Sequence, residues 1–220
     1  VPKHSYIQII WYPGTSVRYD TFISNKGEVM PIISLSSFKG GVSKTTSAIC
    51  LATLFSSDGA TLVIDADQNR SATTWARPGN LPFQVCGEKE AAKLMRKQRF
   101  EFIIFDTPAR PTGAEVEELA RGCDLLIIPT PPDLLGIDAM ALMAKSLPPE
   151  TNWRVLLTMI PPPPQKDGQE AMEALVSQGY PVFSRGIRFY KAYKDAVTSG
   201  VPIYKVRGGK VAWRDWAEIK

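Results

Sequence analysis

The sequence predicts an α/β fold in which helices cover both faces of one open, mostly parallel sheet. Apolar runs of strand length recur along the chain, and helix-like segments lie between them. Uninterrupted apolar runs are typical of strands buried on both faces, and their alternation with helices is typical of a parallel sheet. Ligands of such sheets bind beyond the carboxyl ends of the strands, so the residues after each run are the first candidates for a site.

The expected elements follow one another in a regular order. The apolar runs predict strands at 31–36, 61–65, 102–106, 125–129 and 153–158. The segments between and after them predict helices near 47–57, 88–97, 113–121, 136–146 and 168–178. The prolines at 161–164 predict a stiff local turn rather than a domain boundary. A length of 220 residues suits one domain with a sizeable core.

Composition argues against several classes of protein. The chain is 44% hydrophobic and 22% charged, as expected of a soluble globular protein. We see no apolar run of about 18 residues that would predict a transmembrane helix, and no signal-peptide pattern at the start. Cys50, Cys86 and Cys123 are single and widely spaced. This spacing predicts reduced thiols and a cytoplasmic protein.

A glycine-containing loop follows the first apolar run. It reads Lys-Gly-Gly-Val-Ser-Lys-Thr-Thr over residues 39–46, and a helix-like segment comes next. A loop of this kind directs backbone N–H groups and a helix N-terminus at an anion. Lys44 would then reach the outer phosphates of a nucleotide, and the Thr45 hydroxyl would bind Mg²⁺. The standard G-x-x-x-x-G-K-[ST] pattern is not met, because Phe38 and Ser43 stand at its glycine positions.

The loop does match K-G-G-x-x-K-T, the deviant Walker A motif of the ParA/MinD ATPases, and residues 31–220 resemble that family. The resemblance implies a P-loop NTPase fold, ATP and Mg²⁺ as cofactors, and Mg²⁺-dependent ATP hydrolysis. In the family the early lysine, here Lys39, crosses a dimer interface to the partner's nucleotide, so Lys39 and Lys44 are the expected catalytic cations. The expected nucleotide-binding residues of the loop are Gly40, Gly41, Val42, Ser43, Lys44, Thr45 and Thr46.

Two carboxylates end the second apolar run. Asp65 and Asp67 are two positions apart, which places them on the same side of a strand. One such residue can orient the attacking water while the other holds the Mg²⁺ shell. The resemblance implies that Asp67 positions the water, which leaves Asp65 for the metal. The family often has Pro-Gln-Gly next, whereas this chain has residues 68–71 as Gln-Asn-Arg-Ser, so the shape of the loop is not predicted.

The third apolar run resembles a Walker B strand, because it ends in Asp-Thr-Pro-Ala at 106–109. Asp106 would hold Mg²⁺ through water, since Mg²⁺ keeps several of its waters. No arginine is obviously placed to neutralise the transferred phosphoryl group within one chain, so Lys39 of a second subunit is the expected source of that charge. The resemblance further implies that residues 128–133 lie near the dimer interface and that Met159 and Pro161 contact adenine.

Basic residues gather near the end of the chain. The net charge of +4 is modest, but residues 185–220 hold far more basic than acidic side chains. This bias predicts either a surface for nucleic-acid phosphates or a solvated basic face. The candidate DNA contacts are Arg185, Arg188, Lys191, Lys194, Lys210 and Arg214.

The resemblance implies a positioning ATPase. Such a protein forms a homodimer with ATP, binds non-specific DNA of the nucleoid, and responds to a ParB- or McdB-like partner that stimulates hydrolysis. The chain is short and reads D-A-D-x-x-x-S-A-T-T-W over 65–75, which is most similar to small ParA proteins, including the McdA-like ATPases that space carboxysomes. Plasmid partition is the nearest alternative, and sequence does not separate the two.

Two further classes compete. A MinD-like membrane-associated ATPase needs an amphipathic C-terminal helix, and Trp213, Trp216 and Ile219 recur at helical spacing among basic residues. Membrane binding is nevertheless not expected, because the stretch is short. Iron–sulfur carriers need converging cysteine ligands, which the scattered cysteines do not predict.

Residues 1–29 do not fit the alternating pattern. They are irregular, and Met30 stands where the family usually begins, shortly before the first strand. We expect an N-terminal extension here, either a stretch upstream of the natural start or an arm added to a sheet edge. Residues 30–220 are then expected to form a single ParA-type ATPase domain.

Overall fold

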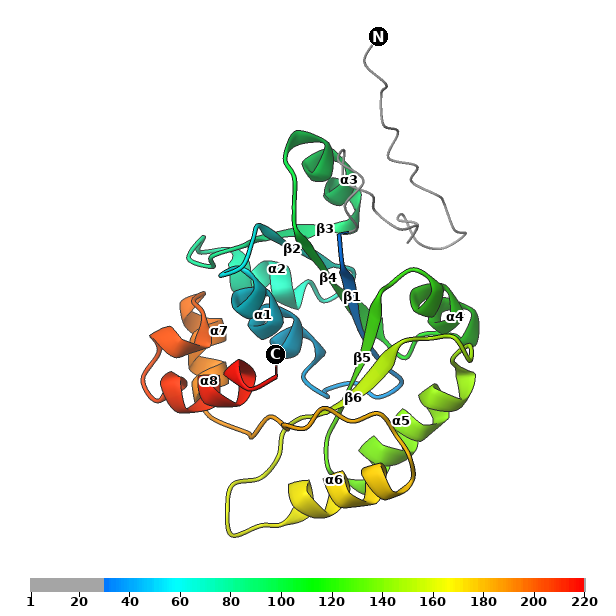
Figure 1. Cartoon of the computed structure of the whole chain (residues 1–220). Helices are drawn as coiled ribbons and strands as arrows, with labels where there is room; N and C mark the ends of the chain where they lie inside the picture. The colour runs from blue at the N-terminus through cyan, green and yellow to red at the C-terminus, as the bar shows by residue number, and fades with distance from the viewer. Residues whose placement is uncertain (1–29, 220) are drawn as a thin grey trace.

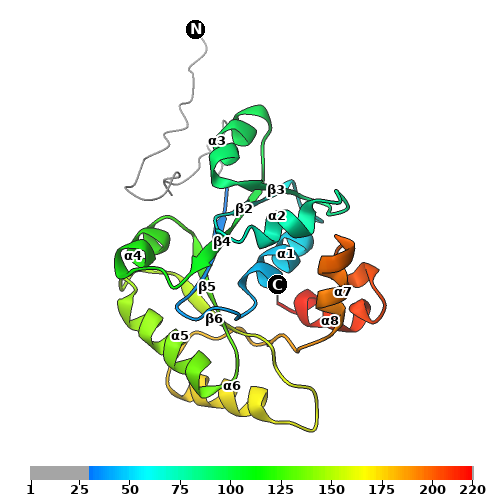
Figure 2. The ribbon, with the colours of Figure 1, turned by 180° about the vertical axis from the view of Figure 1, so that it is seen from behind.

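The computed structural model describes residues 30–219 (Figure 1). The expected N-terminal extension at 1–29 lies outside the described residues. Within 30–219 a single sheet runs through the centre of the molecule, and helices cover both of its faces (Figures 1 and 2).

The sheet has six strands in the order β3-β2-β4-β1-β5-β6, and every pairing is parallel. A parallel order of this kind brings the carboxyl ends of neighbouring strands to one edge. Asp65 at the end of β2 therefore pairs in register with Asp106 of β4. The strands are β1 (Ile32–Ser37), β2 (Thr61–Asp65), β3 (Gln84–Gly87), β4 (Phe102–Ala109), β5 (Leu125–Thr130) and β6 (Trp153–Leu157).

The helices divide between the two faces. The residues that pack together place α1, α2, α7 and α8 on one face, and α3, α4, α5 and α6 on the other (Figures 1 and 2). The helices are α1 (Lys44–Phe55), α2 (Ser71–Ala76), α3 (Glu88–Lys97), α4 (Gly113–Arg121), α5 (Leu134–Ser146), α6 (Asp167–Ser177), α7 (Ala192–Ser199) and α8 (Gly209–Ala217), with a 3₁₀ turn η1 (Ile203–Lys205) before α8.

Alternate residues of each strand enter different halves of the core. Ile33 and Leu35 of β1 pack with α1 and α8, whereas Ile32 packs with α3 and α4. All of β1 and all of β2 are buried. Burial on both faces is why these strands read as continuous apolar runs rather than as alternating ones.

The expected strands and helices are confirmed, and elements in three regions were not expected. Strand β3 has only four residues and is partly exposed, so it lacks an apolar run. Helix α2 has only six residues, and it begins after a left-handed Arg70 rather than after a recognisable cap. Helix α7 was not predicted, and α8 was considered only through the helical spacing of Trp213, Trp216 and Ile219.

The alternative based on a membrane-binding C-terminal helix is not supported by the packing of α8. Trp216 is fully buried and donates a hydrogen bond from its indole N–H to the Tyr193 hydroxyl at 2.9 Å. Trp213 packs edge-on against Tyr204, and Ile219 packs against the core. The tryptophans of α8 thus pack against the body of the protein, whereas Val211 of this helix is exposed. Among residues 30–219, no helix is both long and apolar enough to cross a membrane.

Candidate nucleotide-binding site

The loop between β1 and α1 adopts the backbone of a phosphate loop. Gly41 has φ of 73°, and Ser43, the residue before α1, has φ of 69°. Left-handed backbone costs a residue with a side chain about 1–2 kcal/mol, which explains why a glycine usually stands at the position of Ser43. The strain at Ser43 therefore marks a conformation that the surrounding structure imposes.

Neighbouring strands hold this loop in place. The hydroxyl of Thr158, just after β6, donates to the Val42 carbonyl at 3.1 Å, and Val42 itself is buried. Gly40 lies against Ala109, where a Cβ added to Gly40 would meet the Ala109 side chain at 3.9 Å. The Ser47 N–H closes the first turn of α1 by donating to the Ser43 carbonyl at 2.9 Å. These contacts fix the loop at the N-terminus of α1, where backbone donors converge on an anion.

Lys44 points into the interior of the site. Its side chain is buried, and burial lowers the pKa of its ammonium while the nearby Asp106 and Asp67 oppose that shift. A buried ammonium among carboxylates is poorly solvated, so it gains from a polyanionic ligand that replaces its lost water. The structure thus brings Lys44, Asp67 and Asp106 together.

Asp106 is an unsatisfied buried carboxylate. It is fully buried, and among the described residues neither of its side-chain oxygens has a hydrogen-bond partner. Burial raises the pKa of Asp106 to about 7, with Asp65 adding to the shift and with Thr45 and Lys44 opposing it. Orphaned buried acceptors of this kind need a cation or water to satisfy them.

Asp65 is held in a different way. One of its side-chain oxygens accepts from both the N–H and the hydroxyl of Thr73 in α2, at 2.8 and 2.7 Å. The other has no hydrogen-bond partner among the described residues. The Arg70 guanidinium donates to the Asp65 backbone carbonyl. One side-chain oxygen of Asp65 is therefore used by a hydrogen-bonded contact within the protein, and the other is available to a ligand. Sequence analysis identified neither Thr73 nor Arg70 as a neighbour of Asp65.

The loop after β2 takes a defined turn despite its departure from the family pattern. A side-chain oxygen of Asp67 accepts from the Asn69 N–H at 2.8 Å, and the Asp67 carbonyl accepts from the Arg70 N–H at 3.0 Å. Aspartate commonly stabilises such a turn through its own side chain. Arg70 completes it in the left-handed region, with φ of 51°.

The oxygen atoms of Asp106, Asp65 and Thr45 fit the coordination of a Mg²⁺ ion. No group of three His, Cys, Asp or Glu side chains among residues 30–219 could hold a metal on its own. Mg²⁺ in nucleotide sites is typically bound by one or two carboxylates together with phosphate oxygens and waters. The free oxygens of Asp106, the free oxygen of Asp65 and the hydroxyl of Thr45 match that incomplete set of ligands.

Lys39, at the start of the loop, forms an ion pair at the surface. Its ammonium donates to a side-chain oxygen of Asp133 at 2.8 Å. Asp133 is the N-cap of α5, where the same oxygen accepts from the Gly136 N–H at 2.7 Å. The predicted interface segment 128–133 is thus in contact with the predicted interface lysine.

Two cavities adjoin the loop, and Met159 lines both. A cavity of about 310 Å³ is lined by Lys39, Gly41, Asp133 and Pro161 as well as prolines at 131 and 132. A smaller one of about 110 Å³ lies beside Ser43, Thr46 and Ser47 and reaches the segment 187–189. The structure therefore places Met159 and Pro161 beside the loop, and it adds Arg188 and the exposed Phe189, which sequence analysis did not connect with the base.

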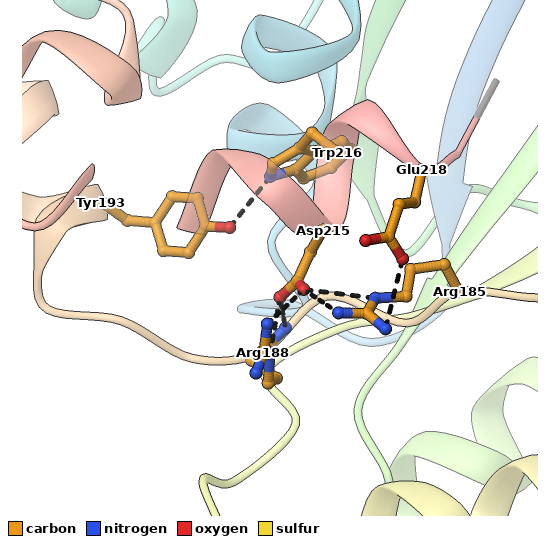
Figure 3. Close-up of polar contacts among 6 residues, drawn as sticks. All are labelled: Arg185, Arg188, Tyr193, Asp215, Trp216 and Glu218. Carbon is orange, nitrogen blue, oxygen red and sulfur yellow. Dashed lines mark hydrogen bonds and ion pairs between the residues drawn. The ribbon is translucent and has the colours of Figure 1, made fainter. Parts of the chain in front are cut away.

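The candidate DNA contacts fall into two groups. Arg185 and Arg188 surround Asp215 of α8, whose side chain is fully buried, at 2.7 and 2.6 Å (Figure 3). Arg185 also contacts Glu218 at 3.3 Å, and the Arg188 N–H donates to Asp215 at 3.2 Å. These arginines join α8 to the segment between α6 and α7. The second group is exposed on α8, α7 and the residue before α7: Lys191, Lys194, Lys210 and Arg214.

The cysteine prediction agrees with the structure. Cys50, Cys86 and Cys123 are all free, and Cys50 is buried in the core. Burial raises the pKa of Cys86 to about 11 and that of Cys123 to about 12, and it raises the pKa of Cys50 further. Thiols with such pKa values are unreactive at neutral pH.

Comparison with known proteins identifies the family of the chain. The family model described as "CobQ/CobB/MinD/ParA nucleotide binding domain" matches residues 33–203. A Maintenance of carboxysome distribution protein A from Gloeobacter kilaueensis is 32% identical over 185 residues, covering 80% of this chain and 85% of that protein. Protein ParA from Rhizobium radiobacter is 26% identical over 147 residues, covering 60% and 66%.

Solved structures share the fold at lower identity. An ATP complex of McdA from Cyanothece superposes with a TM-score of 0.67 at 17% identity, covering 87% of this chain and 95% of that chain. The cell division protein MinD from Aquifex aeolicus gives a TM-score of 0.63 at 20% identity, covering 85% and 94%. These likenesses confirm the predicted fold, an open parallel sheet with helices on both faces.

Proposed function

The chain belongs to the CobQ/CobB/MinD/ParA nucleotide-binding family and contains its ATPase domain, and on that premise we propose that it positions a cargo by ATP-driven dimerisation on DNA. The observation that carries this proposal is that two lysines of one loop have different surroundings. Lys44 is buried beside Asp67 and Asp106, whereas the Lys39 side chain is 31% exposed and pairs with Asp133 at the surface. A site that needed only its own residues would have no use for the second lysine at that position.

The residues of one protomer would bind and orient ATP. The loop N–H groups and Lys44 hold the phosphates, and Asp67 orients the attacking water. Thr45, Asp106 and the free oxygen of Asp65 would hold Mg²⁺, directly or through water. When bound, Mg²⁺ neutralises charge on the phosphate oxygens. Lys39 of a second copy then supplies the remaining positive charge, which makes hydrolysis depend on dimerisation.

The base would lie in the smaller cavity, next to the N-terminus of α1. Met159 lines this cavity from the loop after β6, and Arg188 and Phe189 line it from the segment after α6. Pro161 lines the adjoining larger cavity. Phe189 is 56% exposed, which leaves its ring available to a flat base.

The exposed lysines and arginine of α7 and α8 form the proposed DNA surface. Their side chains are free to approach phosphates, whereas Arg185 and Arg188 are committed to Asp215. Contacts of this kind neutralise the backbone without reading base sequence. We therefore assign DNA binding to Lys191, Lys194, Lys210 and Arg214. Arg185 and Arg188 would support this surface through their contacts with Asp215 of α8.

The similarity to the Gloeobacter protein favours carboxysomes as the cargo. The similarity to Protein ParA supports plasmid partition as the second candidate. Either cargo would carry a ParB- or McdB-like partner that stimulates hydrolysis and releases the ATPase from DNA. This cycle would place the protein on the nucleoid in the cytoplasm.

Binding to a non-specific DNA duplex tests the proposal. We expect binding only with Mg²⁺ and ATP, and we expect it to persist in Asp67→Ala, which binds ATP without positioning the water. The logarithm of affinity should fall linearly with the logarithm of salt concentration, by about 0.9 per phosphate contacted. Binding that ignores the nucleotide, or no binding at all, would contradict the proposal.

A matched pair of variants tests the surface itself. Lys194→Ala on α7 should weaken DNA binding and reduce the salt slope by about one contact. Lys145→Ala removes the same charge from α5, on the opposite face of the sheet, and should leave both unchanged. Equal effects of the two variants would mean that net charge, and not this surface, governs binding.

A further inference from the structure

Lys39 is tied to its own protomer. Its ammonium donates to Asp133 at 2.8 Å, and the two side chains are 31% and 53% exposed. A lysine that reaches the nucleotide of a second copy has to extend away from its own protomer. In this structure it instead lies over the loop that begins α5.

Asp133 does two things with one oxygen. It accepts from the Gly136 N–H at 2.7 Å, which caps α5, and from the Lys39 ammonium. The positive charge of Lys39, acting chiefly through this hydrogen bond, holds the pKa of the Asp133 carboxyl below its ordinary value. Asp133 is therefore ionised at neutral pH and is a competent partner for the lysine. The cap fixes its position, because the oxygen cannot leave without uncapping the helix.

Apolar side chains project next to this ion pair. Leu134 and Leu135, the first two residues of α5, are 75% and 69% exposed. Arg110, after β4, is also exposed and has φ of 59°, and its N–H donates to the Ser37 carbonyl at 3.1 Å, close to the start of the loop. Exposed leucines beside a pair of opposite charges are typical of a surface that another protein covers.

We propose that Asp133 is the resident counter-ion of Lys39, which it holds within its own protomer and releases when a second copy of this chain docks over Leu134 and Leu135. This inference rests on the proposed function, because it needs an ATP-dependent dimer. It adds a positioning residue, because Asp133 would act only through the lysine. Each copy must break its Lys39–Asp133 pair before Lys39 can contact the partner's phosphates. Breaking these two pairs costs free energy and so weakens dimerisation.

The size of this effect on dimerisation follows from the solvent exposure of the Lys39–Asp133 pair. One exposed ion pair changes an equilibrium by about 1.4- to 5-fold at room temperature. A dimer breaks two, so removing the pair should tighten dimerisation by about 2- to 30-fold. Salt screens exposed pairs, and rising salt should therefore narrow the difference.

Asp133→Asn separates the two roles of the residue. Asparagine caps a helix as well as aspartate does, so α5 keeps its N-cap while the ion pair is lost. The matched control is Asp138→Asn, which removes the same charge from an exposed position one turn further along α5. Wild type, Asp133→Asn and Asp138→Asn would be compared by sedimentation velocity with Mg²⁺ and a non-hydrolysable ATP analogue.

We expect Asp133→Asn to dimerise about 2- to 30-fold more tightly than wild type, and Asp138→Asn to match wild type. A second readout needs no dimer. Reductive methylation of the Lys39 amine, followed by mass spectrometry in nucleotide-free protein, should be faster in Asp133→Asn, and added salt should accelerate it in wild type alone. A purely structural role for Asp133 as a cap would change neither quantity.

The outcomes separate the inference from the proposed function. If wild type stays monomeric with every nucleotide, the proposed function is wrong and the inference falls with it. If wild type dimerises but Asp133→Asn dimerises no more tightly, or Lys39 methylation is unchanged, only the inference is wrong. Tighter dimerisation of Asp138→Asn to the same degree would also overturn it, because general charge would then explain the effect.

Discussion

Two ion-pair clusters of this protein use similar chemistry in opposite settings. Around Asp215 two arginines meet one fully buried carboxylate that accepts hydrogen bonds from their side chains and from one backbone N–H (Figure 3). Around Asp133 a single lysine meets a half-exposed carboxylate through one hydrogen bond. The first cluster joins segments 30 residues apart into one unit, whereas the second joins two surface loops.

The difference shows which contacts can be exchanged during a functional cycle. Breaking a buried charged pair by removing one partner typically costs about 3–5 kcal/mol, because the remaining charge is left without solvent. An exposed pair contributes only about 0.2–1 kcal/mol, since water replaces either partner. The Asp215 cluster is therefore a stable structural contact that holds α8 in place. The Lys39–Asp133 pair, by contrast, is weak enough to open when a ligand or a second copy competes for the lysine.

The largest expected effect comes from Asp215→Ala. It leaves Arg185 and Arg188 without the buried carboxylate that both of them surround, and it detaches α8 from the segment between α6 and α7. We expect the free energy of unfolding to fall by about 3 kcal/mol, the lower end of the buried range, because both arginines are about one-third exposed and regain some water. Urea unfolding monitored by tryptophan fluorescence measures it. A loss below about 1 kcal/mol would make this cluster no different from a surface pair.

The pH dependence of stability sharpens the same point. Burial alone would raise the pKa of Asp215, but hydrogen bonds from Arg188 and Arg185 outweigh it and the pKa is lowered. The folded protein therefore binds fewer protons than the unfolded chain between the two pKa values, so this contribution is complete above the unfolded pKa of about 3.9 and is lost as the pH falls through the folded pKa. We expect the stability difference between wild type and Asp215→Asn to stay constant from pH 7 to 5 and to shrink below pH 4. Urea titrations at several pH values measure it, and a difference that disappears near pH 6 would contradict this assignment.

The smallest effects are expected from the exposed partners. Glu218→Gln loosens a contact of 3.3 Å to Arg185, and Asp133→Asn removes the pair with Lys39 while keeping the helix cap. Each should lower the free energy of unfolding by about 0.2–1 kcal/mol. Thermal unfolding of both variants beside wild type checks this. A loss of several kcal/mol in Asp133→Asn would mean that the pair is a structural fastening and not an exchangeable one.

Sequence alone predicted the parts of the site that are contiguous in the chain. The loop at 39–46 and the acidic ends of β2 and β4 are each one short segment whose spacing already dictates its geometry. The parallel sheet then brings Asp65 and Asp106 into register without further information. Local pattern was sufficient here because strand direction and strand ends determine where such residues meet.

The parts that sequence did not predict depend on contacts between distant segments. Thr73 reaches Asp65 only because the turn after β2 reverses the chain, and no motif announces that hydrogen bond. Arg185 and Arg188 were counted as DNA contacts because charge density along the chain does not show that Asp215 lies between them in space. The partnership of Lys39 with Asp133 spans 94 positions and could not be read from either motif.

Mixing two inactive variants tests directly whether Lys39 acts on the nucleotide of a second copy. Lys39→Ala keeps Asp67 in its own site, and Asp67→Ala keeps Lys39 for its partner, so a mixed dimer contains one complete site. The ATPase rate of each variant alone and of an equal mixture would be measured with Mg²⁺ and non-specific DNA. We predict that each variant alone is inactive and that the mixture recovers about a quarter of the wild-type rate, as random pairing with one working site per mixed dimer requires. Activity in Lys39→Ala alone, or no recovery on mixing, would contradict the account.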